Sequence, residues 1–172
     1  MVSYIQSNYM GFGSGVVVPG TGISLQNRGA CFTLQPGHPN LVGGGKRPFH
    51  TIIPAFLTRE GKPVMSFGVM GGDMQPQGHL QMIVRILDYG QNPQAAADAP
   101  RWKVSKSGEV LLEPAVPSLV VEGLRDRGHR VRVSGKGEVE IGSYGSAQLI
   151  YRVEGGYVAG SEGRRDGQAV GF

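Results

Sequence analysis

Two adjacent glycines, Gly71 and Gly72, are the residues of this sequence whose type and position first suggest chemistry. They lie between an apolar run typical of a strand, PVMSFGV (63–69), and a run typical of a helix that begins near Met74. Glycine at such a junction leaves backbone N–H groups that no neighbouring side chain has to cover. These donors suit a negative charge, whether a bound anion or an oxyanion formed during a reaction. A simple turn explains the same pair, so the pattern alone leaves both interpretations open.

The residues around the two glycines predict a hairpin followed by a helix. TIIPAFLT (51–58) and PVMSFGV (63–69) are the two strands, and the charged segment REGK (59–62) is the turn between them. Apolar residues then recur at three- and four-residue spacing, which predicts a helix from Met74 to Tyr89. One face of that helix would carry Leu80, Ile83, Val84 and Leu87.

Shorter elements are predicted on both sides of this central stretch. Before it we expect strands at 2–8, 16–18 and 23–27, and then an irregular segment at 28–46. After it we expect helices at 94–98 and 117–128 and strands at 102–104, 110–113, 130–133, 147–153 and 157–159. Because strands come first, then helices, then more strands, the order predicts an α+β layered fold.

Length and composition predict a single globular domain, 1–172. The 29 glycines and 11 prolines are spread along the chain without a period, which is typical of short strands and tight turns. Lys and Arg form no run longer than two, and the net charge is only +4, so we expect no nucleic-acid partner.

Metal, disulfide and membrane chemistry have no support in the sequence. A single cysteine, Cys31, excludes an internal disulfide. The histidines lie too far apart for the short spacings of a metal site, and no cofactor is indicated. They are His38, His50, His79 and His129. No apolar run is long enough to cross a membrane, and the first ten residues do not read as a signal peptide.

Five motifs in a fixed order resemble the small, C-terminal subunit that self-cleavage produces in the γ-glutamyltranspeptidase family. They are NYMGFGSGVVVPGTGISLQN (8–27), GKRPFHTIIPAF (45–56), GVMGGDMQPQGHLQM (68–82), LDYGQNPQAAADAPRW (87–102) and VAGSEGRRDGQAVGF (158–172). The likeness covers Val2 to Phe172. It implies the fold of the N-terminal-nucleophile hydrolases, a four-layer sandwich of helices, sheet, sheet and helices, of which this chain would form part.

The resemblance also implies a reaction. In that family a threonine at the N-terminus of the small subunit attacks the γ-glutamyl carbonyl, and its own amine serves as the base. Water then hydrolyses the acyl-enzyme, or an amine accepts the acyl group. The oxyanion donors would be Gly71 and Gly72, and the large N-terminal subunit of the same precursor would be the partner. The substrate would be a γ-glutamyl or related acyl amide of the glutathione type.

The nucleophilic threonine of the family has no counterpart in this chain, where the match starts about one strand late. We expect a fragment of a longer precursor that lacks its first strand and nucleophile. A non-catalytic remnant or binding protein of the same fold is the alternative, and the coding sequence immediately upstream distinguishes the two. Relatives are cytoplasmic or periplasmic, and the sequence does not choose between these compartments.

Several positions resemble residues that hold the substrate in the family. Asn8 matches an asparagine that contacts the glutamyl group, and Gln6 or Ser7 falls where a Thr or Ser usually lies. His50 and Thr51 replace paired serines that help bind the α-carboxylate, and both can still donate hydrogen bonds. We therefore expect these five residues at the substrate site.

Two further positions depart from the family in charge. Where the family commonly has a Gln or Glu and then an Asp that hold the α-ammonium, this chain has Arg28 and Cys31. Attraction to an ammonium would become repulsion, which at short range in a partly buried site costs about a few kcal/mol. We therefore predict an acyl group without a free α-amine, for example a glutaryl-type chain.

Structural roles without function are also consistent with several of these residues. Arg28 could pair with a surface carboxylate, Cys31 could be a small apolar residue in the interior, and His50 could be a core histidine. His79 is expected to be exposed on the polar flank of its helix. Asp166 could support the site from behind, or belong to a turn.

Overall fold

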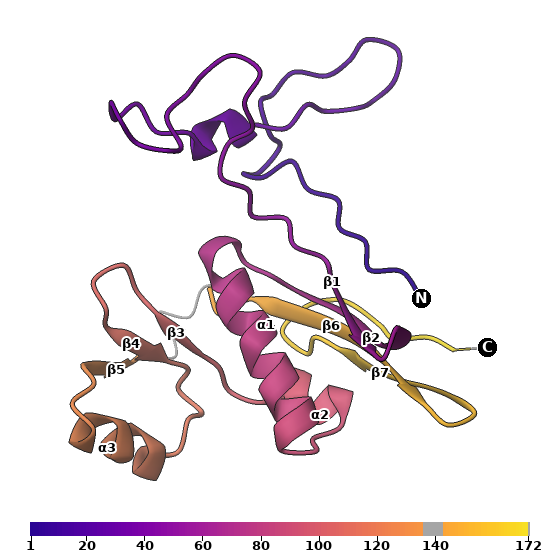
Figure 1. Cartoon of the computed structure of the whole chain (residues 1–172), viewed down its shortest axis with the longest axis vertical. Coiled ribbons are helices and arrows are strands. Elements are labelled where there is room, and N and C mark those ends of the chain that lie inside the picture. Colours follow the sequence, from indigo (N-terminus) through magenta and orange to yellow (C-terminus); the bar gives the residue numbers. More distant parts are fainter. Residues whose placement is uncertain (136–142, 172) are drawn as a thin grey trace. The chain divides into compact units, whose positions relative to one another are not determined.

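The computed structural model describes residues 1–135 and 143–171, so Phe172, the last residue of the final motif, lies outside the described part. The chain divides into two compact units (Figure 1). The sheet unit contains Met1–Ser3 and Ile53–Phe172, and the loop unit is Tyr4–Ile52. The single domain expected from the length stays a prediction.

The predicted hairpin is present and forms half of a four-stranded antiparallel sheet. Strands β1 (Ala55–Arg59), β2 (Lys62–Met70), β6 (Ser146–Val153) and β7 (Gly156–Ser161) lie in the order β1-β2-β6-β7 (Figure 1). Glu60 and Gly61 join the hairpin with positive φ angles of 52° and 75°, the signature of a tight hairpin turn that follows the sheet twist. Strand β1 begins after Pro54, later than predicted, because proline has no N–H to donate to the ladder.

Two helices cover one face of this sheet. A short 3₁₀ turn, η2 (Gly72–Met74), leads into α1 (Gln75–Ile83), and a π-helical turn, η3 (Val84–Asp88), completes the predicted long helix. Helix α2 (Pro93–Asp98) follows, and Asn92 caps it by accepting a hydrogen bond from the Ala95 amide at 2.8 Å. The core between helices and sheet contains Met65, Phe67, Val69, Met82, Ile86, Ala96, Ala97, Ala147 and Leu149.

The buried face of the long helix is not the apolar stripe that the spacing singled out. Leu80 and Leu87 are 51% and 37% exposed. The residues buried instead are Gln75, Gly78, Gln81, Met82 and Ile86. Side-chain hydrogen bonds explain why polar residues are tolerated there: Gln81, for example, donates to the Trp102 carbonyl at 2.9 Å and accepts from its amide at 3.0 Å.

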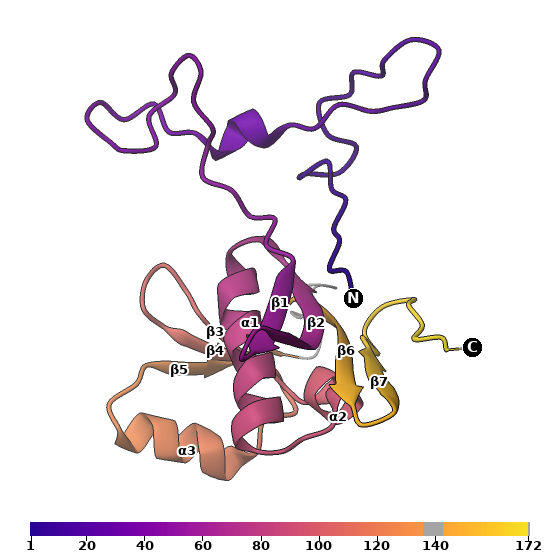
Figure 2. The same cartoon turned by 45° about the vertical axis from the view of Figure 1, so that its right-hand side comes forward.

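A second, smaller sheet lies beside these helices within the sheet unit (Figure 2). Strands β3 (Trp102–Val104) and β4 (Val110–Leu112) are antiparallel. Strand β5 (Val131–Val133) runs parallel to β4, and helix α3 (Ser118–Asp126) makes the crossover that a parallel pair requires. The strands predicted in this region are confirmed, and the mixture of helices and sheets agrees with the predicted α+β class.

The loop unit has little regular structure. Its one helical turn among the described residues is η1 (Arg28–Cys31), and the predicted strands at 16–18 and 23–27 reduce to a single bridge between Val17 and Ser24. The predicted strand at 2–8 is wrong. Val2 and Tyr4 are each 80% exposed, and extended backbone without a paired neighbour gains no ladder hydrogen bonds. In the described part of the chain, no helix has the length and apolarity needed to span a membrane.

Candidate active site

The two glycines singled out in the sequence form a sharp turn at the end of β2, called the glycine turn below. Gly71 has φ 139° and ψ 32°, and Gly72 has φ 57°. The first of these conformations is one that side chains other than glycine rarely adopt. The chain reverses here from β2 into η2, where the Met74 amide donates to the Gly71 carbonyl at 3.1 Å.

Space around the glycine turn is as restricted as its backbone. A Cβ atom added to Gly71 would lie 2.9 Å from the Cα atom of Gly145, and one added to Gly145 would lie 2.7 Å from Val69 Cγ1. On the helix side, a Cβ on Gly78 would lie 2.5 Å from the same methyl group of Val69. Glycines on three segments therefore allow α1, β2 and the start of β6 to approach closely around the end of β2.

The amides of the glycine turn remain available to a ligand. Within the described residues, neither the Gly71 nor the Gly72 N–H donates to a protein acceptor. The amide of Val69, two residues earlier, does have a partner: it donates to His79 Nε2 at 3.0 Å. Available backbone donors at the end of a strand are what an oxyanion site requires.

His79 is half-buried, so the prediction that it is exposed is wrong. Its ring lies 5.2 Å from that of Phe67, centroid to centroid, and Nε2 accepts the Val69 amide. Burial lowers the pKa of His79 below its ordinary value of 6.5. The imidazole therefore carries its proton on Nδ1 and serves as a neutral acceptor for the strand that ends in the glycine turn.

A buried ion network lies behind the same turn, and no pattern in the sequence indicates it. Arg101 and Glu162 are 0% and 1% exposed, and Arg101 Nη2 contacts Glu162 Oε2 at 2.6 Å. Arg164 joins them through Glu162 Oε1 at 2.6 Å, and it also pairs with Glu113 at 2.8 Å. Burial alone would raise the pKa of Glu162, but hydrogen bonds from Arg164, the Ala147 amide and Arg101 outweigh it and hold that pKa below its ordinary value.

The loop unit brings together three of the residues predicted to bind substrate. Arg28 Nη1 donates to Thr51 Oγ1 at 2.9 Å, and Nη2 donates to Ser7 Oγ at 3.3 Å. The guanidinium also lies over the ring of Tyr9, 5.2 Å from its centroid. These four residues are called the Arg28 cluster below.

Arg28 is only 7% exposed, so it is not the surface ion pair that a structural role suggested. Among the described residues no carboxylate pairs with it; its side-chain partners are hydroxyl groups and a ring. A buried cation without an anion is costly, because the charge has left water without a compensating partner. An anion beside the guanidinium would offset this cost.

The remaining predicted substrate residues do not join the Arg28 cluster. Asn8 donates to Ser24 Oγ at 2.6 Å and so braces the loop unit internally. Cys31 is partly buried, and its carbonyl accepts from the Asn40 side chain at 2.7 Å. Gln6 and His50 are exposed, so His50 is not a core histidine. Their predicted roles stay predictions.

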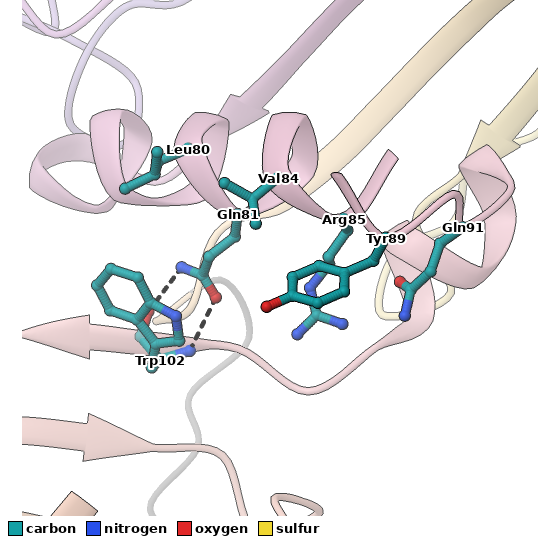
Figure 3. A pocket seen from close by; sticks show the side chains of 7 residues that line it. All are labelled: Leu80, Gln81, Val84, Arg85, Tyr89, Gln91 and Trp102. Carbon is teal, nitrogen blue, oxygen red and sulfur yellow. Dashed lines mark hydrogen bonds between the residues drawn. The ribbon is translucent and has the colours of Figure 1, made fainter. Parts of the chain in front are cut away.

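A pocket of about 470 Å³ opens elsewhere in the sheet unit, between α1, η3 and the first residue of β3 (Figure 3). Its lining combines apolar and aromatic side chains with two glutamines and one cation, Arg85, which donates to the Pro100 carbonyl at 2.6 Å. None of the predicted site residues lines it. The described residues also contain no group of three His, Cys, Asp or Glu side chains placed to hold a metal ion.

Known proteins match this chain along its full length. The gamma-glutamyltranspeptidase family model matches residues 1–172. The glutathione hydrolase-like YwrD proenzyme of Bacillus subtilis is 41% identical over 99% of this chain. The oxamate amidohydrolase proenzyme of Klebsiella pneumoniae is 38% identical over 99%. The chain spans 33% of the length of each of these two relatives.

A solved structure supports the same assignment at the level of the fold. The cephalosporin acylase from Bacillus halodurans is 52% identical, with a TM-score of 0.86, and the match covers 95% of this chain and 30% of that one. The predicted fold, part of an N-terminal-nucleophile hydrolase, is confirmed. Since the matches take in both the sheet unit and the loop unit, one ancestry accounts for the fold and for the order of the motifs: the chain belongs to the gamma-glutamyltranspeptidase family.

Proposed function

We propose that this chain forms the oxyanion-binding part of an amidohydrolase and acyltransferase of the N-terminal-nucleophile type. The observation that carries the proposal is the glycine turn, with its two available amides at the end of a buried strand and a backbone shape that favours glycine. Preorganised N–H groups of this kind stabilise the negative charge that develops on a carbonyl oxygen during acyl transfer.

The proposed reaction runs through an acyl-enzyme. A threonine hydroxyl attacks the amide carbonyl of the substrate, its proton passes to the threonine's own amine, and the carbonyl oxygen becomes an oxyanion held by the amides of Gly71 and Gly72. The tetrahedral species then collapses, and the leaving amine takes the proton as the C–N bond breaks. Water or a second amine attacks the resulting ester and releases the acyl group.

Residues 1–172 span 33% of the length of the two proenzyme relatives, and the proposal assigns the threonine and the large N-terminal subunit to the remainder of such a precursor. One face of the main sheet is suited to such a partner. The face opposite the helices presents apolar side chains to solvent: Phe56, Met70, Ile150 and Tyr157 are 44–64% exposed. An apolar sheet face of this kind marks an interaction surface.

The acyl group of the substrate is the second part of the proposal. γ-Glutamyl amides are the substrates that the family resemblance implies, but the buried cation of the Arg28 cluster favours an acyl chain that ends in a carboxylate and lacks an ammonium group. Glutaryl amides fit this description. Two relatives are named for substrates other than γ-glutamyl compounds, a cephalosporin acylase and an oxamate amidohydrolase.

Hydrolysis of three anilides by the full-length gene product that contains this chain tests both parts. Glutaryl anilide carries the carboxylate alone, γ-glutamyl anilide carries carboxylate and ammonium, and pentanoyl anilide carries neither. We expect release of aniline with the order glutaryl, then γ-glutamyl, then pentanoyl, and an acyl adduct on a threonine by mass spectrometry. Absence of any adduct would overturn the acyl-enzyme, whereas a strong preference for γ-glutamyl anilide would overturn only the glutaryl assignment.

A further inference from the structure

We propose that Arg101 and Glu162 are positioning residues for the glycine turn: they hold the backbone segment against which that turn packs. The proposal rests on the oxyanion role of Gly71 and Gly72 and assigns a task to a buried ion pair that the reaction itself does not use. Neither residue touches the substrate. Both act through the start of β6.

Arg101 holds the start of β6 by donating to backbone carbonyl groups of the residues just before that strand. Its Nη1 donates to the Gly145 carbonyl at 2.8 Å and to the Tyr144 carbonyl at 3.3 Å. Its Nη2 donates to the Ala97 carbonyl at 2.7 Å as well as to Glu162. One guanidinium therefore fixes the residue before β6 relative to helix α2.

Glu162 holds the same segment by an amide. Its Oε2 accepts the Ala147 N–H at 2.7 Å in addition to the contact with Arg101. Val69 and Ala147 are opposite each other in the β2–β6 ladder, but their amides do not bond across it. The Val69 amide donates to His79, and the Ala147 amide, which faces away from β2, donates to Glu162. The Glu162 carboxylate thus supplies the acceptor for a backbone N–H at the place where β6 begins.

The held segment is the neighbour of the glycine turn. Met70 pairs with Ser146, and the next residue, Gly71, lies so close to Gly145 that an added Cβ would be 2.9 Å from its Cα atom. A shift of Gly145 therefore has to move Gly71 or open a gap beside it. Because a misplacement of about 1 Å in a catalytic group can lower a rate by ~100-fold, the placement of this segment matters to the chemistry.

Stability alone is a poor explanation for the pair. Replacing a buried ion pair by apolar residues of similar volume is often neutral or stabilising, so such a pair is weak evidence of a stabilising role. Arg101 also leaves its Nε buried without a hydrogen-bond partner in the described residues, which is a cost. The ion pair fixes the position of the three peptide groups between Tyr144 and Ala147.

The test compares Arg101→Lys with a matched control, Arg85→Lys, in the full-length gene product. Lysine keeps the charge but loses the planar fork that reaches three carbonyls and a carboxylate together. Arg85 lies nearby and donates to the Pro100 carbonyl, and among the hydrogen bonds of the described residues it makes none to residues 144–147. Each variant is assayed for kcat and KM with the preferred anilide and for inhibition by two ligands of the same acyl chain.

The two ligands separate positioning from folding. A boronic acid becomes a tetrahedral anion on the nucleophile and so requires the oxyanion donors, whereas the carboxylic acid product does not form that adduct. For Arg101→Lys we expect kcat to fall by ~10- to 100-fold with KM changed less than about threefold, and boronic acid inhibition to weaken by a similar factor. Product inhibition should change less than about threefold, and Arg85→Lys should leave all four quantities within about twofold.

The outcome that overturns the proposal is a lowered melting temperature with unchanged kcat and boronic acid inhibition, because the pair would then serve folding only. If Arg101→Lys does not fold, Glu162→Asp keeps the charge, withdraws the carboxylate by one methylene and is judged by the same measurements. Failure of the proposed function looks different: the wild-type protein would then neither cleave an anilide nor bind the boronic acid.

Discussion

The glycine turn and the Arg28 cluster are built in opposite ways. The turn presents backbone N–H groups, and its position is fixed by the register of β2 with β6. The Arg28 cluster presents side chains from a unit with almost no regular structure, held by hydrogen bonds between loops. One site therefore depends on the sheet ladder, and the other depends on the identity of a few side chains.

The difference indicates how substitutions can alter each site during evolution. Any substitution other than proline leaves a backbone N–H donor in place, but one that alters the turn can displace that donor. A cluster made of loop side chains can exchange its charge while the sheet unit is untouched, since loops vary and carry specificity on a rigid scaffold. The proposed reaction and the proposed acyl preference would then be separable, and three predictions test that separation.

The largest effect is expected from Gly71→Ala. An added Cβ meets the Gly145 backbone at 2.9 Å, and the φ of 139° is strained for alanine, so the amides of the glycine turn must move. Because loss of one oxyanion donor lowers kcat by ~100- to 1,000-fold, a fall of that size is expected, measured with the preferred anilide in the full-length gene product. All acyl chains should be affected alike.

Gly61→Ala is the matched control. Gly61 also has a positive φ, 75°, but a Cβ there meets nothing within 4 Å, and it lies in the β1–β2 turn. This variant should lose about 1 kcal/mol of stability and keep its kcat. Full activity of Gly71→Ala would show that the turn is not the oxyanion site.

Features that depend on local backbone geometry could be predicted from the sequence. The glycines of the glycine turn and of the β1–β2 hairpin indicated turns, and the structure has positive φ angles there. Asn92 before Pro93 indicated the start of α2. The grouping of Ser7, Arg28 and Thr51 followed from the family resemblance, because nothing in their spacing brings them together.

Features that depend on distant partners could not be predicted. Arg101 and Glu162 are 61 residues apart and carry no local pattern, so only the folded chain shows that each neutralises the other. His79 was expected to be exposed because its acceptor role depends on the Val69 amide, ten residues away in the sequence. The buried helix face was misjudged for the same reason, since close packing of Gly78 on Val69 outweighs the apolar stripe.

Arg28→Gln is expected to change selectivity and leave the reaction intact. Glutamine can still bond to Thr51 but removes the cation, so a carboxylate at the end of the acyl chain loses a charge-assisted hydrogen bond worth ~1.5–3 kcal/mol. The ratio of kcat/KM for glutaryl over pentanoyl anilide should fall by ~10- to 100-fold. Turnover of pentanoyl anilide should change little, in contrast to Gly71→Ala.

Arg47→Gln provides the comparison for that experiment. Arg47 is an exposed arginine of the same loop unit, so its removal changes the net charge equally without touching the Arg28 cluster. Selectivity should be unchanged in this variant. An equal loss of selectivity in both variants would assign the effect to overall charge instead of to the cluster.

The smallest effect is a pH dependence confined to the sheet unit. His79 has a folded pKa below 6.5, so the unfolded chain takes up a proton first as the pH falls, and the stability that the neutral ring contributes is lost between pH 6.5 and that lower folded pKa. The loss should be no more than about 1 kcal/mol, one hydrogen bond from the Val69 amide. Urea unfolding at pH 7.5 and 5.5 measures this loss of stability.

His79→Gln, which does not titrate, should reduce the difference in stability between the two pH values, whereas His129→Gln, at an exposed position, should retain it. Equal profiles for all three proteins would mean that the strand bearing the glycine turn does not depend on the neutral imidazole.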